Sequence, residues 1–116
     1  MNGSQEQSIK LTISVGGDER RCHHPLFAEV LRILREQGLT SATLTKGIMS
    51  YGRDRQIHST MNEITSENLP IIIELIGEQV KTETAAKLIA EMLGGRGLVE
   101  LHRTTVIRHA ATEKEK

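Results

Sequence analysis

Residues 70–76 read PIIIELI, an almost continuously apolar run with one glutamate. A strand with one face in water alternates apolar and polar residues. Unbroken apolarity over this length is typical of a strand that is buried on both faces. The run therefore predicts an inner strand, against which the rest of the chain has to pack.

Three more strands and two helices are predicted around it. Residues 9–15, IKLTISV, alternate with period two, and further strands are predicted over about 42–49 and 98–108. Apolar residues at three- and four-residue spacing predict two amphipathic helices. The first begins with Pro25 as its first helical residue and stops at Gly38, and the second covers about 79–93 and stops at Gly94-Gly95.

The predicted order of elements is βαββαβ, the ferredoxin-like plan. In this α+β fold, both helices cover one face of a four-stranded antiparallel sheet. The second face stays uncovered, and the apolar run at 70–76 places too many apolar side chains there for contact with water. Self-association would cover this face, so we expect a homotrimer.

Length and composition limit the class of protein. With 116 residues and 37% hydrophobic content, the chain fits one domain over residues 8–109, with a flexible N-terminal tail (1–7) and a charged C-terminal tail (110–116). Fifteen basic and fifteen acidic residues give no net charge, which disfavours nucleic acid as a partner. Cys22 is the only cysteine, and we find neither a leader nor an apolar run of roughly 20 residues. A cytoplasmic protein is expected.

Several known uses of this fold can be compared on residues. An RNA-recognition module needs aromatic platforms on its strands, but the chain has one Phe and one Tyr, and Phe27 lies on a predicted helix. An acylphosphatase-like enzyme could use Arg20 and Arg21 in GGDERRCHHP, but the glycine and phenylalanine pattern usual there is missing. A third possibility is a metal site at Cys22, His23 and His24, which is disfavoured because consecutive residues rarely all face one ion.

Two further segments are candidates for ligand binding. Residues 94–97, GGRG, combine unobstructed backbone N–H groups with an arginine fork suited to phosphate oxygens, although a helix cap and tight turn would also explain them. Residues 51–59, YGRDRQIHS, form a charged loop between two strands, which can also be read as an ordinary polar hairpin turn. The loop has few apolar side chains whose burial could offset the conformational entropy lost on ordering it, so we expect this loop to be mobile.

The chain also resembles a known family in five segments that follow in order and spacing: KLTISVG, HPLFAEVLRILREQGLTSATLTKGIMSYG, IHST, LPIIIELI and GLVELHRTTVIR. They are similar to the PII-like family called domain of unknown function 190, over about residues 9–108. The resemblance implies a trimer that binds adenine nucleotides in clefts between subunits and has no catalytic activity. It also implies a hairpin loop, the T-loop, that partner proteins recognise.

The resemblance implies roles for particular residues. Tyr51-Gly52-Arg53 is similar to the base of the T-loop, residues 94–97 correspond to the phosphate-holding B-loop, and Arg108 matches an arginine that reaches the ligand of a neighbouring subunit. The expected ligand-binding residues are Ser50, Tyr51, Gly52, Arg53, Gly94, Gly95, Arg96, Gly97 and Arg108. The B-loop pattern is shortened here, so ATP, ADP, AMP and cyclic nucleotides all remain open.

The sequence therefore predicts a PII-like signalling protein that needs no cofactor. An adenine nucleotide would be its regulatory ligand, and the loop at 51–59 would signal to a partner protein, for which a membrane transporter or channel is one candidate. The alternative is a CutA-like metal-binding or stress-tolerance trimer.

Overall fold

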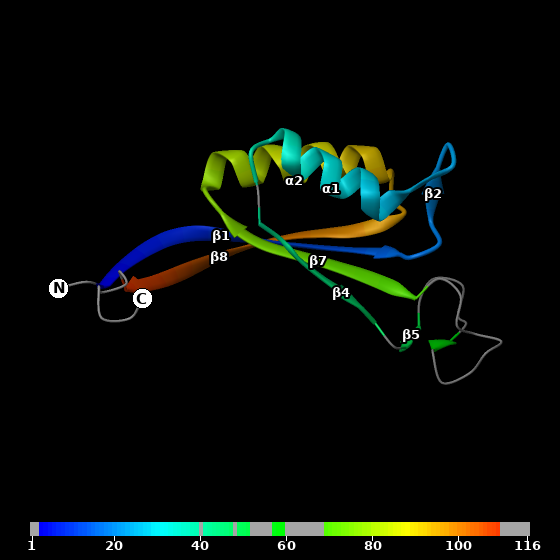
Figure 1. The fold of residues 1–116 in the computed structure, drawn as a ribbon, viewed down its shortest axis with the longest axis horizontal. Coiled ribbons are helices and arrows are strands. Elements are labelled where there is room, and N and C mark those ends of the chain that lie inside the picture. The colour runs from blue at the N-terminus through cyan, green and yellow to red at the C-terminus, as the bar shows by residue number, and fades with distance from the viewer. Residues whose placement is uncertain (1–2, 40, 48, 52–56, 60–68, 110–116) are drawn as a thin grey trace, which may run out of the picture.

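The computed structural model describes residues 3–39, 41–47, 49–51, 57–59 and 69–109. A four-stranded antiparallel sheet has both helices on one face, as Figure 1 shows. The elements in chain order are β1 (Gly3–Gly16), β2 (Arg20–Arg21), β3 (His24–Pro25), α1 (Leu26–Glu36), β4 (Thr43–Lys46), β5 (Met49–Tyr51), β6 (Ile57–Ser59), β7 (Pro70–Gly77), α2 (Gln79–Leu93) and β8 (Gly97–His109). The predicted ferredoxin-like fold is confirmed.

The strand order in the sheet is β4-β7-β1-β8, so the apolar strand β7 is an inner strand, as predicted. Ile13 of β1 lies opposite Ile73 of β7 on one side and Val99 of β8 on the other. Since side chains alternate along a strand, this register places the apolar residues of three strands on the same face.

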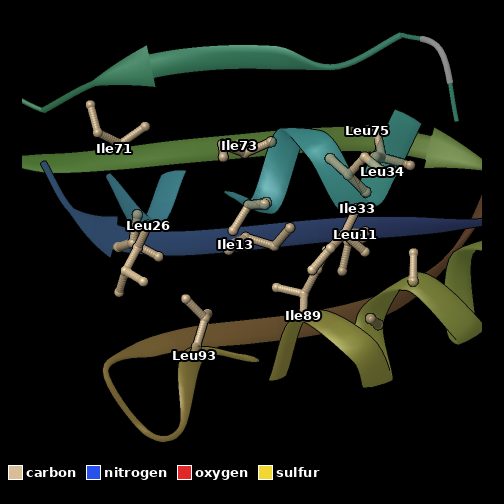
Figure 2. Close-up of a cluster of buried hydrophobic side chains, with 14 residues drawn as sticks. Leu11, Ile13, Leu26, Ile33, Leu34, Ile71, Ile73, Leu75, Ile89 and Leu93 are labelled. Atoms are coloured by element: carbon tan, nitrogen blue, oxygen red, sulfur yellow. The ribbon is translucent and has the colours of Figure 1, made fainter. Parts of the chain in front are cut away.

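The hydrophobic core lies between this face and the two helices (Figure 2). The strands contribute every second side chain, and the helices contribute residues at three- and four-residue spacing. Burying each such Val, Leu or Ile contributes about 1.5–3 kcal/mol. The core residues are Leu11, Ile13, Val15, Leu26, Val30, Ile33, Leu34, Ile71, Ile73, Leu75, Ala85, Ala86, Ile89 and Leu93.

Helix α2 has defined caps at both ends. At its start, the Glu78 carboxylate accepts hydrogen bonds from the N–H groups of Val80 (3.1 Å) and Lys81 (3.0 Å). Both bonds lower the pKa of the Glu78 carboxyl, and the bond from Lys81 contributes more than the bond from Val80. At its end, Gly94 adopts the left-handed conformation with φ 58°. The predicted range of this helix is confirmed.

Three local predictions differ from the structure. Pro25 is the N-cap of α1 and not its first helical residue. The strand predicted over 42–49 is divided into β4 and β5, which belong to different sheets. Strand β1 begins at Gly3, so residues 3–7 belong to a strand and do not form a flexible tail. These residues are polar and show no apolar alternation, because their strand is held by backbone pairing with β8. The sequence pattern therefore did not predict it. The rest of the division into a domain and tails stays a prediction.

Within a single chain, β7 is buried on one face, and its burial on the second face by self-association stays a prediction. Ile71, Ile73 and Leu75 are buried under the helices, whereas Ile72 is half-buried and Ile76 is 49% exposed on the opposite face. Among the described elements, both helices lie on the other face and none covers this one. None of the helices in the described ranges is both long enough and apolar enough to cross a membrane.

Candidate ligand-binding site

The turn between α2 and β8 depends on its glycines for its backbone conformation. Gly94 and Gly95 have φ values of 58° and 86°, which favour glycine, and a Cβ at either position would meet no atom within 4 Å. The turn is closed by hydrogen bonds from Gly94 N to Ala90 O and from Arg96 N to Leu93 O, both of 3.1 Å. Both glycines are therefore needed for conformation, and contact of their backbone with a ligand stays a prediction.

Gly97 in the same turn has a different role. A Cβ there would lie 2.8 Å from the backbone oxygen of Ser14 and 2.9 Å from Leu93 Cδ1 and from Val15 Cγ1. Its lack of a side chain lets the start of β8 pack closely against β1. Gly97 thus positions the turn, and nothing in this packing requires that it contact a ligand.

Arg96 connects this turn to another segment of the chain. Its Nη1 donates a 2.7 Å hydrogen bond to the backbone oxygen of Arg20 in β2. Strands β2 and β3 form a small hairpin at the same end of the molecule as the turn (Figure 1). The guanidinium is exposed, and one of its five N–H donors is used in this bond.

The proposed metal ligands lie at the tip of this hairpin. Cys22, His23 and His24 are exposed, and Cys22 and His23 have φ values of 49° and 76°. Within the described ranges, no three His, Cys, Asp or Glu side chains are placed to hold one ion. A single chain therefore does not assemble a metal site from these residues.

Arg108 lies far from Arg96 in the same chain. Both belong to the region of β8, and twelve residues of extended strand separate them by about 40 Å. A ligand that contacts both arginines has to contact two copies of the chain.

Arg108 lies beside an open groove of about 470 Å³, which sequence reasoning did not find. Register places Lys10, Glu74 and Ile76 on the sheet face away from the helices, and Lys10 Nζ lies 3.2 Å from Glu74 Oε2. The groove therefore combines the Arg108 side chain, the ion pair of Lys10 with Glu74, hydroxyl groups and an apolar wall. Its lining residues are Lys10, Ser41, Ala42, Thr43, Glu74, Leu75, Ile76 and Arg108.

A signal for this groove was present in the sequence. Lys10 and Glu74 are the only charged residues within the two apolar segments 9–15 and 70–76. A charge in an otherwise apolar strand marks the face that is not packed in the core. Their ion pair, however, depends on the register of β1 against β7, which the sequence alone does not give.

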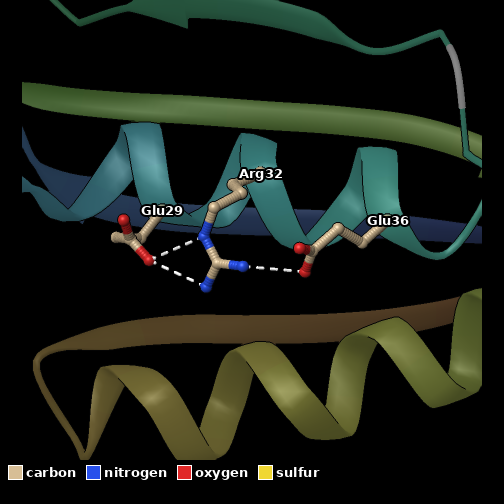
Figure 3. Close-up of polar contacts among 3 residues, drawn as sticks. All are labelled: Glu29, Arg32 and Glu36. Carbon is tan, nitrogen blue, oxygen red and sulfur yellow. Dashed lines mark hydrogen bonds and ion pairs between the residues drawn. The ribbon is translucent and has the colours of Figure 1, made fainter.

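Arg32 on α1 shows by contrast an arginine that is already neutralised (Figure 3). Its Nε and Nη2 lie 3.0 and 2.9 Å from Glu29 Oε2, and its Nη1 lies 2.7 Å from Glu36 Oε1. These contacts, chiefly the hydrogen bond with Glu29, raise the pKa of Arg32. Two carboxylates already match this charge, so Arg32 is a poor candidate for binding an anion.

The remaining predicted ligand residues lie in or beside the hairpin of β5 and β6. Strand pairing places Ser50 opposite His58 and Tyr51 opposite Ile57. Gly52 and Arg53 lie outside the described residues, as does most of the loop predicted to be mobile. Their contact with a ligand stays a prediction.

A model of the DUF190 family, described as Uncharacterized ACR, matches residues 8–106. The chain belongs to the DUF190 family. The resemblance read from the sequence is thereby confirmed. A curated relative of this DUF190 chain is a UPF0166 protein from Aquifex aeolicus (strain VF5), which is 29% identical over 98 residues, 84% of this chain and 90% of the relative.

Solved structures with the fold of this DUF190 chain include PII-like proteins. CPII from Thiomonas intermedia K12, described as a nitrogen regulatory PII-like protein bound to ADP, AMP and bicarbonate, matches with a TM-score of 0.65 at 14% identity, over 89% of this chain and 91% of CPII. A putative PII-like signaling protein from Thermus thermophilus matches with a TM-score of 0.61 at 13% identity, over 90% and 92% of the two chains. At these identities, the likeness establishes the PII-like fold.

Proposed function

We propose that this DUF190 protein is a PII-like regulatory protein without catalytic activity. It assembles as a homotrimer and binds an adenine nucleotide between neighbouring copies. The loop at 51–59 then transmits occupancy of the site to a partner protein.

The separation of the two basic half-sites is the observation that carries this proposal. The glycine turn with Arg96 lies at one end of β8, and the groove with Arg108 and Lys10 lies beside its other end. Each half offers an arginine, whose planar guanidinium suits phosphate oxygens, and neither encloses a ligand by itself. Two copies placed end against end would bring the halves together. The fold of CPII, which is described as bound to ADP and AMP, supports a nucleotide as the ligand.

The uncovered sheet face supports the assembly. It exposes Ile76 (49%) and Leu98 (57%) beside the half-buried Ile72 and Val106. Contact with other copies would remove these apolar side chains from water. A trimer would have a mass of about 39 kDa, from three chains of 12.9 kDa.

Signalling is assigned to the loop because of its position. Strands β5 and β6 form a two-stranded sheet of their own, separate from the main sheet (Figure 1). An isolated two-stranded hairpin is marginally stable in water, so a partner protein or a ligand can change its conformation at low cost.

Calorimetry with ATP, ADP, AMP and cyclic nucleotides tests the proposal, with light scattering to establish the mass. Arg108→Ala and Arg96→Ala should each weaken nucleotide binding about ten- to a hundredfold, the usual range for a hydrogen bond to a charged group. Arg103→Ala is the matched control, because Arg103 is exposed on the same strand but alternates to the other face from Arg108.

Deletion of the loop at 51–59 should spare much of the binding and abolish the response of a partner. Two results would contradict the proposal: a parent protein that binds no adenine nucleotide, or a stable monomer at micromolar concentration. Titration with zinc and copper belongs in the same series, since metal binding in place of nucleotide binding would favour the CutA-like alternative.

A further inference from the structure

The hairpin over residues 20–25 has an unfavourable backbone conformation. Strands β2 and β3 are joined by Cys22 and His23, which both have positive φ. Two-residue hairpin turns of this kind favour Asn-Gly, because a Cβ is strained in the left-handed region. Such a conformation persists only where surrounding contacts hold it.

Few contacts hold this hairpin. Its residues are exposed apart from the half-buried Pro25, and its base is closed by a 2.8 Å hydrogen bond from Leu26 N to Glu19 O. The Nη1 of Arg20 donates a long, local bond of 3.5 Å to His23 O. In the described part of the chain, one side-chain hydrogen bond reaches the hairpin from a distant segment, and its donor is Arg96.

The same bond fixes Arg96. A long side chain that is already ordered loses less conformational entropy when it binds a ligand than a free one does. Four of its five N–H donors remain for an anion, and the bond to Arg20 O holds the guanidinium at the end of the molecule where the Gly94-Gly95 turn lies.

We infer that the hairpin over residues 20–25 is a positioning element of the ligand site, which acts through the backbone oxygen of Arg20 on Arg96. This inference rests on the proposed function, because it requires an anionic ligand at the 94–97 turn. The coupling is reciprocal: if an ordered hairpin strengthens anion binding, a bound anion orders the hairpin by the same factor. A bound anion also neutralises the charges that Arg20, Arg21 and Arg96 bring to this end of the chain.

A double substitution tests the sign of this coupling. Cys22→Asn with His23→Gly places the residues favoured by this turn at the two positive φ positions, and so stabilises the observed hairpin. The variant should bind ADP about two- to tenfold more tightly than the parent protein, the range that corresponds to ordering one long side chain. In an Arg96→Ala background, the same double substitution should give no gain. A gain in both backgrounds, or in neither, would overturn the inference.

Amide hydrogen exchange provides a readout that does not depend on nucleotide. Arg96→Ala should speed exchange of the Leu26 and His24 amides, whereas Arg103→Ala should leave both unchanged. Saturating ADP should slow exchange of these amides in the parent protein. Equal exchange in the parent and Arg96→Ala proteins would overturn the inference whatever the protein binds. If calorimetry shows that the parent binds no ADP, the proposed function fails and the inference fails with it. If the parent binds ADP but the hairpin does not respond, the inference fails alone.

Discussion

Thr82 offers a test in which removing a polar group should stabilise the protein. This side chain is fully buried near the start of α2, and its Oγ1 has no hydrogen-bond partner within the described part of the chain. It faces the backbone of Gly77, where a Cβ would lie 2.6 Å from Oγ1. A buried hydroxyl without a partner costs about 1–3 kcal/mol relative to the unfolded state, where water bonds it.

Replacement of Thr82 by valine keeps the shape of the side chain and removes the hydroxyl. The two residues have similar helix propensities, so the backbone contributes little to the difference. We expect Thr82→Val to raise the free energy of unfolding by about 1–2 kcal/mol. Thr82→Ser is the matched control: it keeps the hydroxyl but loses a buried methyl group, and it should lower the free energy of unfolding by about 1 kcal/mol.

Urea denaturation at one fixed protein concentration measures both effects. The concentration has to be fixed because the stability of an oligomer depends on it. The slope of the unfolding free energy against urea concentration should be the same in all three proteins. Differences between their midpoints then report differences in stability alone. A valine variant that is less stable than the parent by about 1 kcal/mol or more would refute the reasoning, because it would mean that the hydroxyl is hydrogen-bonded in solution.

Three other expectations concern the turn, a helix cap and the loop. Gly97→Ala should lower the free energy of unfolding by about 1–3 kcal/mol, because its Cβ would lie 2.8 Å from Ser14 O; a neutral effect in thermal unfolding would contradict this packing. Since the folded-state pKa of Glu78 is lowered, its contribution to stability is complete above the ordinary Glu pKa of about 4.3 and disappears as pH falls through the lowered value. Glu78→Gln should therefore reduce the loss of stability between neutral and acid pH, and an unchanged pH profile would argue against the cap. Amide exchange in the free protein should be fast across residues 51–59, and strong protection there would contradict the expected mobility.

The sequence predicted most of the fold because the core-facing pattern is local. Alternation in residues 9–15 and the three- and four-residue spacing in both helices depend on neighbours along the chain, and the core is built largely from these segments, although Leu88 on the predicted apolar face of α2 is exposed. The beginning of β1 could not be predicted in this way. Residues 3–7 are polar, and they form a strand because β8 provides backbone partners from about a hundred residues away.

The candidate site was predicted in part for a similar reason. The 94–97 turn was visible because glycines with positive φ carry a signal in the sequence itself. The groove beside Arg108 draws on β1, the start of β4, β7 and β8, and no short segment shows that these meet. The bond from Arg96 to Arg20 O was likewise out of reach, since its acceptor is a backbone oxygen, which every residue has.

The pairing of β1 with β8 has a consequence for the order in which the protein is made. These are the first and last of the described elements, and they pair from Gly3 opposite His109 to Val15 opposite Gly97. A growing chain on the ribosome can therefore form both helices and join β1 to β7 while the other edge of β1 is still open. A product of interrupted translation that lacks β8 would keep this long edge unpaired, and unpaired edges readily add strands from other molecules. Aggregation of incomplete chains should therefore begin at β1, and the synthesis of β8 ends that risk.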